Sequence, residues 1–276
     1  MYRKIISFLE VWKEDEHRKP LILQGARQVG KTYSILEFGR THYENVAYFN
    51  FETNPKLNET FEENISPDYL IPILSHIAGQ TIVKEKTLMV FDEVQLCERA
   101  LTSLKYFCEN APDYHIIVAG SLLGVAVNRA KFSFPVGKVD MKTLYPMDME
   151  EFMMALGEDD LVKQIKKCFQ TDTPLPSALH DAAMQLYRQY LVVGGMPECV
   201  MQFAGTKDYI LVRHTQDTIL ASYLNDMSKY NNLNEIKKTR LAYDNITVQL
   251  SKKNTRFQYK LIKKGGRASE FENAIE

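Results

Sequence analysis

The chain has 276 residues, of which 45% are hydrophobic and 25% are charged, and its formal net charge is −1. This composition is typical of a globular protein with one large or two medium domains. The near-zero charge excludes a global basic field that would draw the whole protein to nucleic acid or anionic lipid. Membrane partners are excluded as well, because no apolar run approaches the ~18 residues of a membrane span.

The cysteines and the N-terminus indicate a compartment. The four cysteines are scattered without a C-x-x-C pair, and the six histidines show no metal-ligand spacing. Glu10 and Lys13 interrupt the apolar residues of the N-terminus, which therefore lacks the pattern of a signal peptide. We expect reduced cysteines in a cytoplasmic protein.

The first predicted elements are a helix over residues 2–14 and a core strand over Leu21–Leu23. The loop Gly25–Thr32 follows and fits G-x-x-x-x-G-K-[ST], the pattern of a phosphate-binding P-loop. Its glycines let successive N–H groups face one concavity, and the helix that starts there adds its positive N-terminal end. Lys31 would neutralise the β- and γ-phosphates, and the Thr32 hydroxyl is a hard oxygen ligand suited to Mg²⁺. The predicted ATP-binding residues are Gly25, Ala26, Arg27, Gln28, Val29, Gly30, Lys31 and Thr32.

Two carboxylates follow a later strand. After a predicted strand over residues 45–51 and a helix over residues 64–79, Thr87–Phe91 holds four consecutive apolar residues, as in a strand buried on both faces. Asp92 and Glu93 end this strand, at the edge where open α/β sheets bind ligands. The pattern is that of a Walker B motif, in which Asp92 holds Mg²⁺ and Glu93 activates the attacking water. An exposed acidic turn is the alternative for the pair taken alone.

The next strand, over residues 114–120, ends beside Ser121. A polar residue at that position can contact the γ-phosphate or the attacking water, and it can equally serve as the N-cap of a following helix. A fifth strand is predicted over residues 140–144. Arg129 and Lys138 are the basic residues best placed to act as an arginine finger or second sensor, although a solvated or salt-bridged role is the common one for such residues.

Strand signals stop after about residue 150. The segment 252–267 is locally basic and is followed by a helix start, a pattern that resembles a helix-turn-helix or winged-helix tail. Its basic side chains could contact DNA phosphates, or they could form the solvated face of a helical bundle. The predicted helices cover residues 158–170, 177–192, 198–204, 207–228 and 234–252.

Several of these motifs together resemble the bacterial and archaeal AAA-type ATP-binding proteins. They are GARQVGKT, LMVFDEVQ, the Gly120-Ser121 pair, SFPVG with LYP, and VGGMP, which spans residues 193–197. The resemblance implies an α/β P-loop ATPase domain over residues 1–150, with a parallel sheet in the order 5-1-4-3-2. It implies a helical, winged-helix-like domain over residues 151–276. It also implies that Gly30, Lys31 and Thr32 bind phosphate and Mg²⁺ and that Asp92 and Glu93 are the Walker B pair.

The resemblance has one departure. Relatives of this type continue into a C-terminal domain of unknown function, suspected to be nuclease-like, whereas this chain stops at residues 271–276, inside an apparent helix without a capping signal. We therefore expect a C-terminally incomplete member of the family.

The sequence thus predicts ATP binding with slow Mg²⁺-dependent hydrolysis. Three alternatives stay open: a nucleotide-gated switch with little turnover, a phosphotransferase that passes the γ-phosphate to a small molecule, and a DNA-associated module that acts through residues 252–267. A protein partner and an oligomer are compatible with the sequence, which identifies neither.

Overall fold

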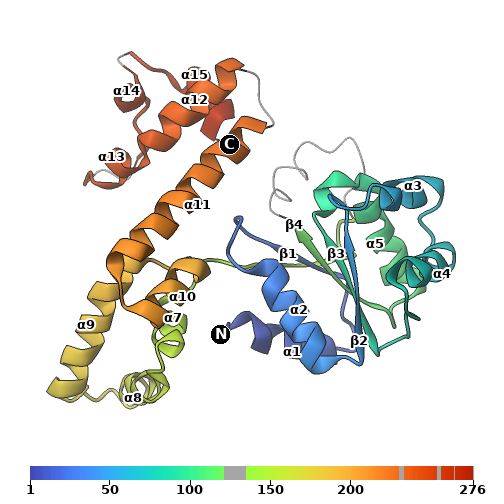
Figure 1. Ribbon diagram of the computed structural model, residues 1–276, viewed down its shortest axis with the longest axis horizontal. Helices are drawn as coiled ribbons and strands as arrows, with labels where there is room; N and C mark the ends of the chain where they lie inside the picture. Colours follow the sequence, from blue (N-terminus) through green and yellow to red (C-terminus); the bar gives the residue numbers. More distant parts are fainter. Residues whose placement is uncertain (121–134, 230–232, 254–255, 264, 276) are drawn as a thin grey trace. The chain divides into compact units, whose positions relative to one another are not determined.

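The computed structural model describes residues 1–120, 135–229, 233–253, 256–263 and 265–275 (Figure 1). Its contacts separate two compact units, Met1–Val212 and Arg213–Glu276. The first unit holds the whole sheet together with several of the helices that follow it. The expected domain boundary near residue 150 stays a prediction.

Within the described ranges, five parallel strands form the sheet, in the order β2-β3-β4-β1-β5. Read from the opposite edge, this is the expected order 5-1-4-3-2, and the α/β fold class is confirmed. Strand β1 lies between β4 and β5. The loop Gly25–Thr32, which follows β1, therefore leaves the sheet between these two strands. The strands are β1 (Leu21–Gln24), β2 (Asn45–Asn50), β3 (Thr87–Asp92), β4 (His115–Gly120) and β5 (Asp140–Thr143).

Helices cover both faces of the sheet (Figure 1). Side chains of β3 alternate between the two sides: Leu88 and Val90 pack with α1 and α2, and Met89 and Phe91 pack with α3, α4 and α5. All four are fully buried, as the continuous apolar run predicts. The covering helices are α1 (Ile5–Glu14), α2 (Lys31–His42), α3 (Lys56–Glu63), α4 (Pro67–Ala78) and α5 (Glu98–Asn110), the last preceded by the short 3-10 helix η1 (Val94–Leu96).

The predicted helix over residues 64–79 is α4, whose ends follow from its sequence. Pro67 occupies its first turn after an extended Ser66, and Gly79 ends it in the left-handed conformation. The preceding helix α3 was not expected, because only Leu57 and Phe61 anchor its two turns.

Further helices of the first unit follow the sheet. Helix α7 begins with a reciprocal capping box between Asp148 and Glu151. Just before it, the Met147 N–H donates to the carbonyl of Gly195, at 2.7 Å. A Cβ atom at Gly195 would lie 2.1 Å from the Met147 carbonyl oxygen, so this close approach requires glycine. These helices are α7 (Met149–Ala155), α8 (Asp159–Gln170), α9 (Ser177–Val193) and α10 (Pro197–Thr206).

The described secondary structure of the second unit is helical. The predicted helix over residues 234–252 is divided in two around Asn245, whose side-chain amide donates to the Leu261 carbonyl and accepts from Gln249. Among the residues described, we find no helix with the length and apolar character needed to cross a membrane. Helix α11 (Tyr209–Lys229) leads into this unit, which continues with α12 (Leu233–Asp244), α13 (Ile246–Leu250), α14 (Tyr259–Ile262) and α15 (Ala268–Ile275).

Candidate functional site

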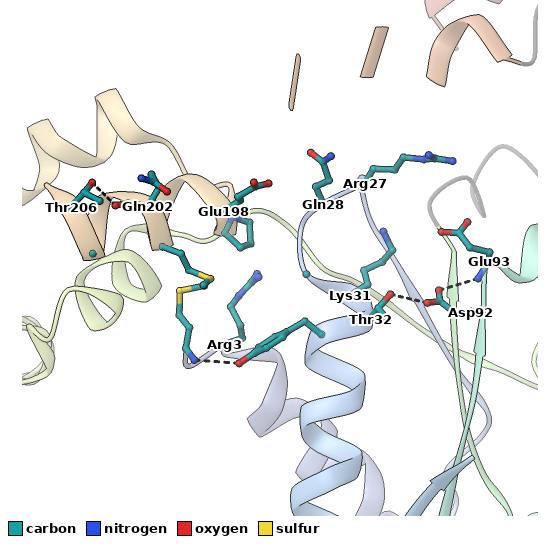
Figure 2. Close-up of a pocket in the computed structure, with 16 residues that line it drawn as sticks. Arg3, Arg27, Gln28, Lys31, Thr32, Asp92, Glu93, Glu198, Gln202 and Thr206 are labelled. Atoms are coloured by element: carbon teal, nitrogen blue, oxygen red, sulfur yellow. Dashed lines mark hydrogen bonds between the residues drawn. The ribbon is translucent and has the colours of Figure 1, made fainter. Parts of the chain in front are cut away.

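The carboxyl ends of β1 and β3 bring the predicted loop and the predicted carboxylates to one edge of the sheet. Both contribute to a cavity of about 680 Å³, whose other wall comes from α10 and the N-terminal residues (Figure 2). Ligands bind at such an edge in open α/β sheets. The cavity is lined by Met1, Arg3, Arg27, Gln28, Gly30, Lys31, Thr32, Tyr33, Asp92, Glu93, Pro197, Glu198, Met201, Gln202, Gly205 and Thr206.

The two glycines of the loop have different reasons to be glycine. Gly30 adopts the left-handed conformation, with φ 88°, as the residue that precedes α2. Gly25 has φ 152°, and a Cβ atom there would lie 2.2 Å from the carbonyl oxygen of Leu144. The close approach arises because the Leu144 N–H donates to the Gln24 carbonyl at 2.8 Å, which continues the β1–β5 pairing. Any side chain at Gly25 would push the end of β5 away from the loop.

Lys31 folds back over its own loop. Its Nζ donates to the carbonyl of Gly25 at 2.8 Å and to that of Ala26 at 2.7 Å. Burial lowers the pKa of the Lys31 ammonium, and the carboxylates of Glu93 and Asp92 act in the opposite direction. The side chain thus places a cation at the mouth of the loop, held by two neutral acceptors that an anionic oxygen can replace.

Asp92 is the centre of a small hydrogen-bond network. Its Oδ2 accepts from the Thr32 hydroxyl at 2.9 Å, and its Oδ1 accepts from the Glu93 N–H at 3.0 Å (Figure 2). The same Oδ2 also accepts from the Tyr48 hydroxyl at 2.7 Å. Asp92 is 5% exposed. Burial, together with the bond to Asp92, raises the pKa of Tyr48 to about 12, while a bond from Asn50 opposes this. Tyr48 therefore stays a hydrogen-bond donor to Asp92 at neutral pH.

The oxygens of Thr32 and Asp92 form a donor set that suits Mg²⁺. They are hard ligands, and they lie side by side next to the loop. Within the described ranges, no group of three or more His, Cys, Asp or Glu side chains could hold a metal by itself. The two protein ligands are compatible with a cation that also takes phosphate oxygens and water, as Mg²⁺ usually does.

Glu93 lies one residue beyond the strand in a strained conformation. Its φ is 54°, in the left-handed region that a glutamate seldom occupies. Its carboxylate accepts a hydrogen bond from the Gln95 amide. Glu93 is half-buried and lines the cavity next to Asp92.

The remaining predicted residues have different places. Arg27 and Gln28 line the cavity, whereas the Val29 side chain packs into the core behind the loop. Lys138 is not among the lining residues; it pairs with Glu109 at 3.0 Å. Ser121 and Arg129 lie outside the described residues, so their predicted roles stay predictions.

Sequence reasoning missed Tyr48, Arg3 and the cavity wall formed by α10. Tyr48 reaches Asp92 because β2 pairs with β3 in the register Asn50 to Asp92, which no local pattern specifies. Arg3 belongs to none of the motifs that the sequence contains. The VGGMP motif contributed to the family resemblance, and it gave no indication that Glu198 and Gln202 line the same cavity as Lys31.

Comparisons with known protein families cover most of the chain. Residues 17–153 match the AAA domain family, and residues 184–276 match a domain of unknown function, DUF8612. No curated protein matches the sequence.

Among solved structures, the chain is similar to a variant of Thermotoga maritima RuvB, with 14% identity over 99% of this chain and 85% of that one and a TM-score of 0.43. It is similar to Drosophila ORC bound to DNA, with 16% identity over 98% and 80% and a TM-score of 0.44. It is also similar to C. elegans PCH-2, with 10% identity over 75% of this chain and 63% of that one and a TM-score of 0.40.

The family match covers the loop, both carboxylates and all five described strands, which are the parts that build one side of the cavity. Residues 17–153 therefore form an AAA-family P-loop domain, which is followed by a DUF8612 domain over residues 184–276.

Proposed function

We propose that this protein hydrolyses ATP in a Mg²⁺-dependent reaction at the cavity between the loop Gly25–Thr32 and Asp92. An AAA domain implies ATP binding. The observation that carries the step from binding to hydrolysis is the grouping of Thr32, Asp92 and Glu93. The first two share a hydrogen bond of 2.9 Å, and the third follows at the strand end in a left-handed conformation and lines the same cavity.

Lys31 and the loop bind the phosphates. The Lys31 ammonium exchanges its contacts with the Gly25 and Ala26 carbonyls for contacts with phosphate oxygens. The new contacts join two opposite charges, whereas the contacts they replace join an ammonium to neutral carbonyls, so the exchange favours the bound state. The positive N-terminal end of α2 supports the same charge.

Thr32 and Asp92 would hold Mg²⁺, which would supply charge neutralisation at the phosphates. Tyr48 keeps Asp92 in place by donating to the oxygen that also contacts Thr32. Because the Tyr48 pKa is raised to about 12, this donor persists across the physiological pH range.

Glu93 accepts the proton of the attacking water. The two carboxylates have different partners, since Asp92 accepts from Thr32 and Tyr48 whereas the Gln95 amide orients Glu93. A positioned general base typically contributes about 10²–10⁴-fold to the rate.

Phosphate release separates hydrolysis from its two nucleotide-dependent rivals. We expect the purified chain to release phosphate from Mg·ATP without any added acceptor. A nucleotide-gated switch would bind ATP with negligible release, and a phosphotransferase would release phosphate slowly while labelling an added acceptor. Binding without either reaction would contradict the proposal of hydrolysis.

DNA association through residues 252–267 is a second candidate function. The sequence of this segment contains no acidic residue, and its described basic side chains are exposed. Lys263 is partly neutralised by Glu270 at 3.0 Å. If the segment contacts phosphates, DNA binding should weaken steeply as salt rises, and replacing Lys252, Lys253 and Arg256 with glutamine should reduce both affinity and salt dependence. Salt-independent or absent binding would contradict this candidate. The exposed basic residues are Lys252, Lys253, Arg256, Lys260, Lys263 and Arg267.

A further inference from the structure

Arg3 joins three separate parts of the first unit through a single guanidinium. Its Nη1 donates to the Val29 carbonyl at 2.7 Å, its Nη2 to the Tyr145 carbonyl at 2.8 Å, and its Nε to Glu151 at 3.1 Å. The side chain is 3% exposed, although it lines the cavity. All three nitrogens of the fork are therefore engaged by the protein itself.

The contact with Val29 acts on the phosphate loop. Because a trans peptide is planar, its carbonyl and the following N–H point in opposite directions. When Arg3 holds the Val29 carbonyl on its own side, the Gly30 N–H is directed away from it. Gly30 lines the cavity and immediately precedes Lys31, so the orientation of this peptide belongs to the phosphate-binding surface.

The contact with Glu151 fixes Arg3 itself. Glu151 is 5% exposed and does not line the cavity. Its Oε1 accepts from Arg3 and from the Lys4 N–H at 2.7 Å, and its Oε2 accepts from the Asp148 N–H in the capping box of α7. The neighbouring Phe152 stacks on Phe203 of α10, with ring centroids 6.2 Å apart. The loop on one wall of the cavity is thus tied to the helices that build the other wall.

We propose that Arg3 is a positioning residue of the nucleotide site, which orients the Val29–Gly30 peptide for phosphate binding and is itself held by Glu151. This inference rests on the proposed function, since it assumes that the loop binds phosphates. Arg3 acts through the loop and not as a ligand of the γ-phosphate. Its loss therefore weakens binding of every nucleotide that contacts the loop, with or without a γ-phosphate.

The test is calorimetric binding of Mg·ATP and Mg·ADP to the full chain and its variants. Arg3→Lys keeps the charge but cannot reach both carbonyls and Glu151 together. Glu151→Gln removes the charge that fixes Arg3 without touching the cavity. We expect both variants to lose affinity for ATP and ADP by the same factor, about tenfold, as for the loss of one charge-assisted hydrogen bond. The matched control is Glu150→Gln, the residue before Glu151 in α7, which pairs with Lys4 and Lys166 and should bind as the native chain does.

Loss of a buried charge pair can also unfold a protein, so a second variant is needed. The double substitution Arg3→Met with Glu151→Leu replaces the pair with apolar side chains, which often preserves folding. We expect it to melt near the native temperature without nucleotide and still to bind both nucleotides about tenfold more weakly, a change that a purely structural pair would not produce.

Three results would overturn the inference. If Arg3→Lys lost affinity for ATP but not for ADP, and Glu151→Gln bound both normally, Arg3 would be a γ-phosphate ligand. Native affinity in the folded double variant would remove Arg3 from the site altogether. Absence of nucleotide binding in the native chain would overturn the proposed function together with this inference, whereas the first two results overturn the inference alone.

Discussion

The two walls of the cavity differ in how the sequence builds them. One wall, the motif wall, is lined by two short segments, Arg27–Thr32 without Val29 and the pair Asp92-Glu93, each of which follows or ends a strand. The other wall, the packing wall, is lined by Met1, Arg3 and residues of α10, which are far apart in the sequence. The Arg3–Glu151 bond and the close contact at Gly195 keep these parts together. The comparison teaches that the residues proposed to react with the nucleotide belong to local motifs, while long-range packing positions these motifs.

The largest effect should follow from removing Lys31 on the motif wall. Lys31→Ala deletes the ammonium that would contact the phosphates, so we expect ATP affinity to fall by on the order of a hundredfold, the loss of two charge-assisted bonds. Titration calorimetry measures the ATP affinity of the native chain and of Lys31→Ala. Lys84→Ala, which removes an exposed pair with Asp113 and a contact with the Tyr114 ring outside the cavity, is the control and should bind ATP normally. Equal affinity in both variants would mean that the motif wall does not bind the phosphates.

On the packing wall, the strongest expected effect is on stability. In Gly195→Ala the new Cβ would lie 2.1 Å from the Met147 carbonyl oxygen, so α7 and the turn before α10 must separate. We expect a loss of about 2–3 kcal/mol in the free energy of unfolding, as for an overpacked site. Gly205→Ala, in α10 with nothing within 4 Å of its Cβ, is the matched control. It should be neutral or gain up to ~1 kcal/mol, because alanine favours helix. Denaturant titration distinguishes them, and equal stability would contradict the tight contact.

A third prediction concerns the opposite end of the sheet from the motif wall. Burial, aided by the positive charges of Arg18 and Lys13, lowers the pKa of His115 to about 4. Because the unfolded state binds the proton at a higher pH, stability is full above pH ~6.5 and is lost as pH falls toward 4. Between pH 7 and pH 5 the loss should be about 2 kcal/mol.

Unfolding titrations across this pH range check the sign and the size. His115→Gln removes the titrating group at the position that contacts Tyr43, so its stability should depend less on pH. A native stability that rises on acidification, or a variant with the same slope as the native chain, would contradict the buried neutral histidine.

The smallest effect should come from Tyr48→Phe, which removes one of two donors to Asp92 Oδ2 and leaves Thr32 in place. Asp92 is then less firmly held, so the Mg²⁺ concentration for half-maximal ATP turnover should rise about fivefold, equivalent to about 1 kcal/mol. Tyr114→Phe is the control, since Tyr114 packs under Lys84 outside the cavity. An unchanged Mg²⁺ requirement in Tyr48→Phe would show that Tyr48 does not position the carboxylate.

Much of the fold could be predicted because its signals are short-range. The apolar run that ends at Asp92 is buried on both faces, and the Ser66-Pro67 and Gly79 signals bracket α4. The order of the strands came from family resemblance, since spacing alone gives only their alternation with helices. The weakly apolar α3 and the break at Asn245 were missed, because side-chain contacts rather than periodicity decide them.

The site divides in the same way. The loop pattern identifies Lys31 and Thr32, and the strand-end position identifies Asp92 and Glu93. Arg3 could not be found, because its three partners lie 26 to 148 residues away along the chain. Tyr48 was hidden for a similar reason: its role depends on the register between β2 and β3.

The central claim is that Glu93 accepts the proton of the attacking water at a site where Lys31 binds the phosphates. It is tested most directly by measuring phosphate release and ATP affinity together for the native chain and Glu93→Gln. Glutamine keeps the shape of the side chain but cannot serve as the base, so we predict native or slightly tighter ATP binding with turnover reduced on the order of 10²–10⁴-fold. Native turnover by Glu93→Gln would contradict the claim, and loss of ATP binding in that variant would instead assign Glu93 to holding the site together.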